Sequence, residues 1–192
     1  MKKKKKNKSS NIAIIAIFFA IMLVIHFLSS FIFSFWLVPI KPTLMHIPVI
    51  IASIAYGPRI GATLGALMGG ISVANSSIVL LPTSYLFSPF VENGNFYSLI
   101  IALVPRILIG IIPYFVYKLL HDRFGLAISG AIGSLTNTVF VLSGIFIFFS
   151  STYNGNIKLM LAGIISSNSL AEMVIAAIIV YLTVPRILNI KH

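Results

Sequence analysis

Residues 98–120 have the sequence SLIIALVPRILIGIIPYFVYKLL, in which Arg106 and Lys118 are the only charged side chains. A helix of about 20 mainly apolar residues crosses the roughly 30 Å hydrocarbon core of a bilayer. This segment is therefore predicted to span a membrane. Because Arg106 lies far from either end of the segment, its side chain is predicted to lie inside the membrane.

The composition of the whole chain agrees with a membrane protein. Of its 192 residues, 58% are hydrophobic and 9% are charged, whereas about 25% are charged in an ordinary soluble domain. The chain contains no cysteine, which excludes disulfides, thiolate metal sites and cysteine nucleophiles. We predict neither a metal site nor a cofactor.

Five further apolar segments surround this one, at about 12–38, 44–56, 60–81, 126–149 and 158–184. The second of them is too short to cross a bilayer alone. We predict an all-α membrane protein, a compact bundle of six transmembrane helices. Residues 1–11 would form a basic cytoplasmic tail, and residues 12–192 a single transmembrane domain.

The distribution of basic residues predicts the orientation. If the six segments alternate across the membrane, 11 of the 14 lysines and arginines fall on the side of the termini, and the opposite side carries Lys41 and Lys158. Cytoplasmic loops carry the excess of lysine and arginine. Both termini are therefore predicted to be cytoplasmic, in the cell membrane of a prokaryote, with the lysine-rich tail as a topology anchor. No nucleic-acid partner is expected.

Small residues indicate how the helices pack. Gly61, Gly65 and Gly69 form a flat ridge at four-residue spacing, where a neighbouring helix can approach closely. Ala102, Arg106 and Gly110 share one face of the next predicted helix. The first helix carries another small-residue face, which consists of Ala13, Ala16 and Ala20. The neighbour of that face is either internal or another protein.

Polar residues on three consecutive predicted helices fall at one depth. Arg106, Asn137, Asn168 and Glu172 share this layer, and Thr136 adds a hydroxyl. Ionisable groups inside a bilayer are costly and mark functional sites by default. Arg106 is predicted to receive an anionic or strongly polar solute, whose hydroxyl or amide groups the neighbours bind. The alternative is an ion pair between Arg106 and Glu172 that only stabilises the bundle.

Two residues assigned to the outer loops complete the candidate substrate site. His46 precedes the second helix, and Tyr85 belongs to an aromatic stretch at 81–95 with several prolines. A loop of this composition is predicted to be an ordered lid over the solute.

Several classes of activity are excluded by missing motifs. The chain has no G-x-x-x-x-G-K-[ST] phosphate loop, no H-E-x-x-H and no G-x-S-x-G. It has three acidic residues, which provide no evident pair for acid–base catalysis. An enzyme is not expected. A stand-alone ion-coupled carrier, with Glu172 as its coupling carboxylate, remains an alternative, as does a scaffold with a purely structural polar layer.

The chain resembles the substrate-binding S components of energy-coupling factor (ECF) vitamin transporters. The resemblance covers nearly the whole chain after the tail. It rests on six helices in this length and on a set of short motifs, namely Ala16-x-x-x-Ala20, His46-Ile47-Pro48-Val49, Gly57-Pro58-Arg59-x-Gly61-x-x-x-Gly65 and Gly133-x-x-Thr136-Asn137-Thr138.

The resemblance implies a function and partners. In this family the small-residue face of the first helix docks on a transmembrane coupling subunit, which for this chain implies Ala13, Ala16 and Ala20. Two separate ATPase subunits supply the energy. The solute site faces outward, between helices four to six and the loops that cap them, and the loaded subunit topples in the membrane to release its vitamin inward.

Further motifs point to a substrate. Ser88-Pro89-Phe90, Pro105-Arg106 and Ser134-Leu135-Thr136-Asn137-Thr138 are most similar to the pantothenate-type S components. Pantothenate carries one carboxylate, one amide and two hydroxyls, which suits one arginine with neighbouring amides. Hydroxymethylpyrimidine or another thiamine-related precursor is the alternative, because Glu172 and Asn137 could bind an aminopyrimidine edge.

Overall fold

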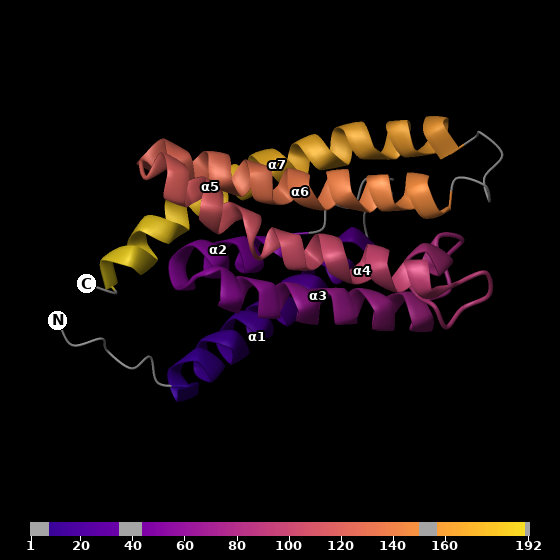
Figure 1. Ribbon diagram of the computed structural model, residues 1–192, viewed down its shortest axis with the longest axis horizontal. Helices are drawn as coiled ribbons and strands as arrows, with labels where there is room; N and C mark the ends of the chain where they lie inside the picture. Colours follow the sequence, from indigo (N-terminus) through magenta and orange to yellow (C-terminus); the bar gives the residue numbers. More distant parts are fainter. Residues whose placement is uncertain (1–7, 35–43, 150–156, 191–192) are drawn as a thin grey trace.

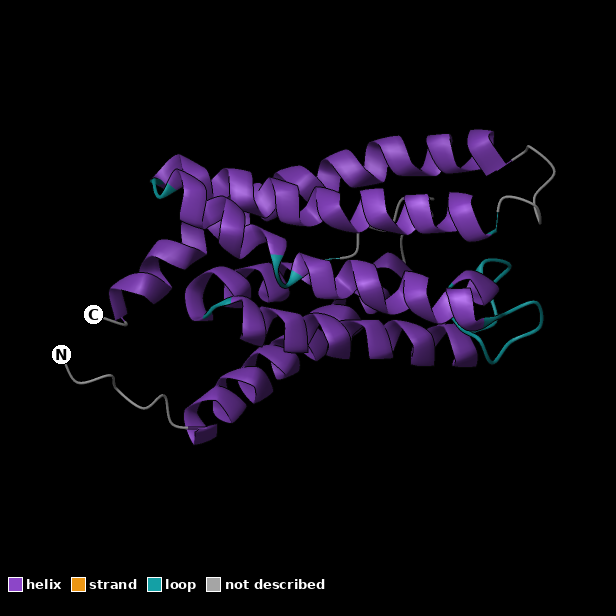
Figure 2. Cartoon of the chain, in the orientation of Figure 1, coloured by secondary structure: helices purple, strands orange, loops and turns teal. Residues whose placement is uncertain are grey.

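The computed structural model describes residues 8–34, 44–149 and 157–190, without the side chains of residues 8, 30, 32–34, 157–168 and 190. Its described part consists of helices and loops, and no strand occurs in it (Figure 2). The elements are α1 (Lys8–Ser34), α2 (His46–Tyr56), α3 (Pro58–Ile78), the 3-10 turn η1 (Ser84–Leu86), α4 (Phe96–Ile109), α5 (Ile112–Leu120), α6 (Arg123–Phe148) and α7 (Ile157–Ile190). The all-α prediction is confirmed.

Four helical segments of the described chain are long and apolar enough to cross a membrane. They are Ser9–Ser29, Phe96–Leu120, Arg123–Phe148 and Ser169–Asn189. Of the other two predicted spans, α2 has 11 residues, and α3 has 21 residues but contains glycine, serine and asparagine that make it less apolar.

The fourth predicted span is present but divided into two helices, α4 and α5. Pro113 has no N–H to donate to the carbonyl of Ile109, so the helical hydrogen bonds are interrupted there. Next to this break, the carbonyl of Gly110 accepts a 2.7 Å hydrogen bond from Ser53 Oγ of α2. A neighbouring helix thus binds a backbone carbonyl at the break.

The short helix α2 lies inside the bundle. It contacts α1, α3, α4, α5, α6 and α7, and every residue of it except Tyr56 is buried. A helix surrounded by protein on all sides does not need to reach both faces of a bilayer. Gly57 ends α2 with a positive φ of 103°, which favours glycine, and Pro58 starts α3. This boundary agrees with the predicted segments 44–56 and 60–81, which it separates.

The glycine ridge of α3 packs against α4 as the sequence predicts. A Cβ atom added to Gly69 would lie 2.8 Å from the carbonyl oxygen of Ala102. A Cβ atom on Gly65 or Gly61 would overlap the carbonyl oxygen of Arg106 or Gly110, respectively. Since these contacts involve backbone atoms, the two helices can lie this close only with glycine at all three ridge positions.

Substitution of Gly65 with alanine is expected to destabilise the protein. The added Cβ meets the backbone of Arg106, which cannot rotate away, and overpacking of this kind costs about 1–3 kcal/mol. Thermal unfolding in detergent should show a clearly lower melting temperature. Gly70→Ala on the same helix is the matched control, because no atom lies within 4 Å of its added Cβ. Equal melting temperatures for the two variants would contradict the close packing of α3 on α4.

Helix α1 packs on the bundle with one side only. Ile14, Ile15, Phe18 and Phe19 contact the buried core around α2, and the ring of Phe18 meets that of Tyr56 edge-on at 5.8 Å. The opposite side is exposed and apolar, and it includes all three residues of the predicted small-residue face, Ala13, Ala16 and Ala20.

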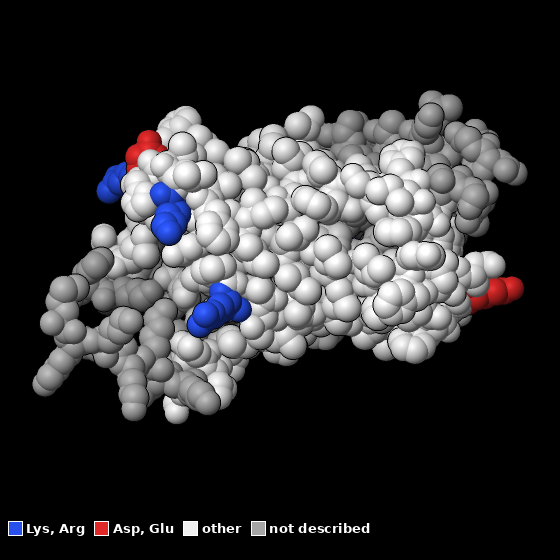
Figure 3. All heavy atoms as spheres, viewed as in Figure 1, with Lys and Arg blue, Asp and Glu red and all other residues white. Residues whose placement is uncertain are grey.

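The two ends of the bundle differ. Figure 1 shows that α1 begins and α7 finishes at the same end, here called the terminal end. The α3–α4 loop (residues 79–95) lies at the opposite end, here called the loop end. The basic surfaces visible in Figure 3 lie in the half nearest the termini, and an acidic side chain marks the loop end. Arg59, Lys118, Arg123 and Arg186 all belong to helix segments near the terminal end.

Candidate functional site

The α3–α4 loop is held by its own hydrogen bonds. The side chain of Ser84 accepts from the N–H of Leu81 at 2.9 Å and donates to the carbonyl of Val79 at 2.8 Å. The hydroxyls of Ser88 and Ser77 lie 2.7 Å apart, which fastens the middle of the loop to α3. These contacts agree with the prediction of an ordered loop.

A second set of contacts fastens the loop to α4 and α6. Asn95 caps α4, and Ser98 Oγ donates to the carbonyl of Tyr85 at 2.6 Å. The rings of Tyr85 and Phe149 meet edge-on at 5.6 Å. Loop and helices thus share one apolar cluster, here called the loop cluster, which consists of the buried Leu86, Ile101, Ile145 and Phe149 with Tyr85, Phe87, Val141 and Phe148 packed against them.

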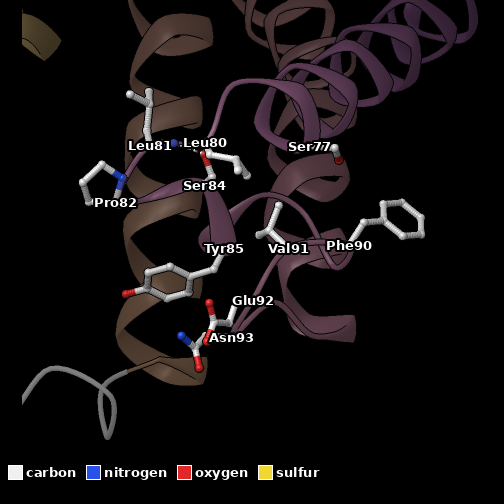
Figure 4. A pocket seen from close by; sticks show the side chains of 10 residues that line it. All are labelled: Ser77, Leu80, Leu81, Pro82, Ser84, Tyr85, Phe90, Val91, Glu92 and Asn93. Atoms are coloured by element: carbon white, nitrogen blue, oxygen red, sulfur yellow. Dashed lines mark hydrogen bonds between the residues drawn. The ribbon is translucent and has the colours of Figure 1, made fainter.

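A pocket of about 600 Å³ opens between the end of α3 and the loop (Figure 4). Its lining is mostly apolar and includes Leu80, Pro82 and Tyr85. Figure 4 shows the side chains of Glu92 and Asn93 next to each other at its rim. The predicted site residue Tyr85 thus lies at a pocket of the loop end.

Arg106 is buried in α4, with 9% of its surface exposed. Its Nη1 donates a 2.8 Å hydrogen bond to the carbonyl of Ile101, five residues nearer the loop end. Its guanidinium carbon lies over the ring of Phe87 at 5.2 Å from the centroid. Its Nε is buried and finds no hydrogen-bond partner among the described residues. Buried polar groups are almost always hydrogen-bonded, so this Nε is available to a ligand.

Helix α6 adds two further buried atoms without a partner in the described part of the chain, Ser134 Oγ and Asn137 Oδ1. One stripe of this helix carries Ser134, Asn137, Val141 and Ile145, and the last two belong to the loop cluster. The two polar residues therefore lie on the same stripe as members of the loop cluster, which also contains Phe87 and Ile101. Helix α6 packs on both α4 and α7.

The hydroxyl of Thr136 is used differently. It is buried and donates to the carbonyl of Ile132 in its own helix at 2.7 Å. Thr136 can therefore contact a ligand only as an acceptor.

Helix α7 contributes a buried carboxyl group, that of Glu172, with 8% of its surface exposed. On the same helix, Ser169 Oγ donates to Thr138 Oγ1 of α6 at 3.1 Å. The side chain of Asn168 lies outside the described residues.

His46 differs from its expected position. It is the first residue of α2 rather than part of an outer loop, and its side chain is fully buried. Its neighbours Met45 and Ile47 belong to the core around α2. Because α2 extends only roughly 16 Å from its end at Gly57, His46 lies at about mid-height of the bundle. The neighbours of His46 thus belong to the core around α2 rather than to the loop cluster.

These atoms can bind an anion with polar substituents. The Nε–H of Arg106, which has no partner within the described segments, suits a carboxylate, and the oxygen of Asn137 can accept a hydrogen bond from a hydroxyl or amide. Within the described segments, no three histidine or acidic side chains come together to hold a metal ion.

Sequence reasoning missed two residues of this site, Phe87 and Ser134. Phe87 is one of several aromatic residues in its loop, and nothing in the spacing selects it as the partner of Arg106. Ser134 stands three residues before Asn137 and so shares its face. That spacing could have identified Ser134 as a candidate site residue from the sequence.

Comparison with known proteins gives two matches. A family model described as "ECF transporter, substrate-specific component" matches residues 10–184, which include α2 to α6 in full. The chain is also similar to the pantothenic acid transporter PanT of Lactococcus lactis subsp. cremoris (strain MG1363), with 46% identity in an alignment of 193 positions that covers 98% of each chain.

Proposed function

Because the chain belongs to the family of substrate-specific components of ECF transporters, we propose that it binds pantothenate for an ATP-driven importer. Membership in this family confirms the resemblance seen in the sequence and the expectation that the chain is not an enzyme. With four apolar helices of spanning length, it is a multi-pass membrane protein.

The observation that carries the proposal is the buried Nε of Arg106, which finds no partner among the described residues. Pantothenate offers one carboxylate to this cation, and its hydroxyls and amide suit Asn137 and Ser134. The pantothenic acid transporter named above is similar over 98% of the chain, which supports the same substrate.

We assign the remaining candidate residues to the same site. We propose that Thr136, Asn168 and Glu172 contact the polar part of the substrate from α6 and α7, and that Tyr85 closes the site from the loop end. Thr136 and Glu172 are buried on the two helices, and Tyr85 belongs to the loop cluster, which supports this arrangement. A contact of His46 with the substrate stays a prediction.

The charge distribution supports an orientation with both termini in the cytoplasm. The positive-inside rule places the terminal end there, with Arg59, Lys118, Arg123 and Arg186. The loop end and its pocket then face outward, toward the incoming vitamin. We place the protein in the cell membrane of a bacterium, as a bundle of six membrane-embedded segments.

The partners follow from the family. Substrate-specific components work with the other subunits of an ECF transporter, and we propose that these are one transmembrane coupling subunit and two ATPase subunits. The exposed face of Ala13, Ala16 and Ala20 on α1 is the proposed docking surface for the coupling subunit. Small residues there let a partner helix approach its backbone closely.

Uptake of labelled pantothenate into proteoliposomes tests this function. The chain alone should bind pantothenate without transporting it. Uptake should require the coupling and ATPase subunits together with ATP. Transport by the chain alone, driven by an ion gradient, would identify an ion-coupled carrier and contradict the proposal.

A further inference from the structure

We propose that Phe87 and Pro105 are positioning residues, which together hold the guanidinium of Arg106 in the orientation that recognises the carboxylate of the substrate. The inference rests on the proposed function and extends it to two further residues. It starts from two contacts of Arg106, with the carbonyl of Ile101 and the ring of Phe87, and from its buried Nε, which has no partner in the described part of the chain.

Pro105 explains why the carbonyl of Ile101 is available. In a regular helix this carbonyl would accept from the N–H four residues later. That residue is Pro105, which has no N–H. The carbonyl accepts from Nη1 of Arg106 instead, at 2.8 Å. The proline thus provides a fixed acceptor one turn from the arginine that follows it.

Phe87 holds the guanidinium from a second direction. Its ring lies 5.2 Å from the guanidinium carbon, within the range of a cation–π interaction. The ring itself is placed by the loop cluster and by the adjacent Ser88, whose hydroxyl meets that of Ser77. The orientation of Arg106 therefore depends on a properly seated α3–α4 loop.

These two contacts leave one edge of the guanidinium for a ligand. Nη1 donates to the carbonyl of Ile101, and the guanidinium carbon lies over the ring of Phe87. The edge that carries Nε and Nη2 remains, and two parallel N–H donors on such an edge match the two oxygens of a carboxylate. The geometry thus favours side-on binding of a carboxylate over binding of a neutral group.

The test compares pantothenate with pantothenol, in which a primary alcohol replaces the carboxylate. Both ligands are titrated calorimetrically into the full chain in detergent, and the ratio of their affinities reports on carboxylate recognition. Phe87→Leu removes the aromatic face, so this ratio should fall about tenfold, mainly through weaker pantothenate binding. Phe87→Tyr retains the face and should preserve the ratio.

Pro105→Ala provides an independent variant. The new N–H competes with Arg106 for the carbonyl of Ile101, so the ratio should fall about threefold. If Phe87→Leu is unstable in a thermal melt, the affinity ratio of Pro105→Ala decides whether the contacts of Arg106 control carboxylate recognition. An unchanged ratio in the folded variants, or an equal loss for both ligands, would overturn the inference and leave the proposed function intact. Failure of the unmodified chain to bind pantothenate would overturn both.

Discussion

Replacement of Arg106 with glutamine is expected to weaken pantothenate binding at least about 25-fold while the protein stays folded. The substitution removes the cation that faces the carboxylate, and a buried charge that loses its partner costs about 2–5 kcal/mol. Every 1.4 kcal/mol corresponds to a tenfold change in affinity. Calorimetric titration of the detergent-purified variant measures the effect directly.

A matched control exists within the same chain. The pentapeptide Val-Pro-Arg-Ile-Leu at 104–108 occurs again at 184–188, where Arg186 is exposed near the terminal end. Arg186→Gln should therefore leave pantothenate binding unchanged. If Arg106→Gln retained full binding and instead lowered the melting temperature, Arg106 would be a structural residue, in line with an ion pair that stabilises the bundle.

The second large effect is expected from substitutions in α1, which should act on assembly with the coupling subunit. The double substitution Ala16→Leu and Ala20→Leu should abolish assembly with the coupling subunit, and with it ATP-dependent uptake. Both residues lie on the exposed face of the helix, and leucine there prevents a partner helix from approaching closely. Co-purification with tagged coupling subunit measures assembly, and calorimetry on the isolated chain should show unchanged pantothenate binding.

Ala74→Leu is the control for this experiment. Ala74 is also exposed in a helix, but it belongs to α3 rather than to the proposed docking face. It should leave assembly intact. Normal co-purification of the α1 double variant would contradict the docking assignment, and loss of pantothenate binding by that variant would indicate a disturbed fold rather than a lost interface.

The features that sequence alone predicted correctly depend on local chemistry or regular spacing. Gly57 and Pro58 mark the turn between α2 and α3, because a positive φ favours glycine and proline starts a helix. The ridge that ends at Gly69 predicted its contact with α4, because glycines at four-residue spacing form one flat face. Both signals can be recognised without knowledge of the partner.

The features that the sequence did not predict depend on contacts between elements that lie far apart in the chain. His46 precedes an apolar segment, and only the packing of α2 among six other helices shows that it is buried. The carbonyl of Gly110, beside the break between α4 and α5, accepts a hydrogen bond from Ser53, 57 residues earlier in the chain. Such contacts between distant residues follow no period that a single sequence displays.

The candidate site combines both kinds of feature. Arg106 stands out in the sequence because charges inside a membrane are rare. Its orientation depends on the ring of Phe87, which reaches it from the α3–α4 loop. The missing N–H of Pro105 was visible in the sequence, but its consequence for Ile101 depends on where the side chain of Arg106 points. The candidate residue Arg106 could thus be identified from the sequence, whereas its contacts with Phe87 and Ile101 could not.

The proposal that the chain binds pantothenate is tested most directly by calorimetric titration of the purified chain with pantothenate, followed by hydroxymethylpyrimidine and other vitamins. We expect saturable one-to-one binding of pantothenate and no comparable signal from the other compounds. Absence of heat with pantothenate, together with saturable binding of hydroxymethylpyrimidine or another vitamin, would contradict the assignment of the substrate and the role given to Arg106.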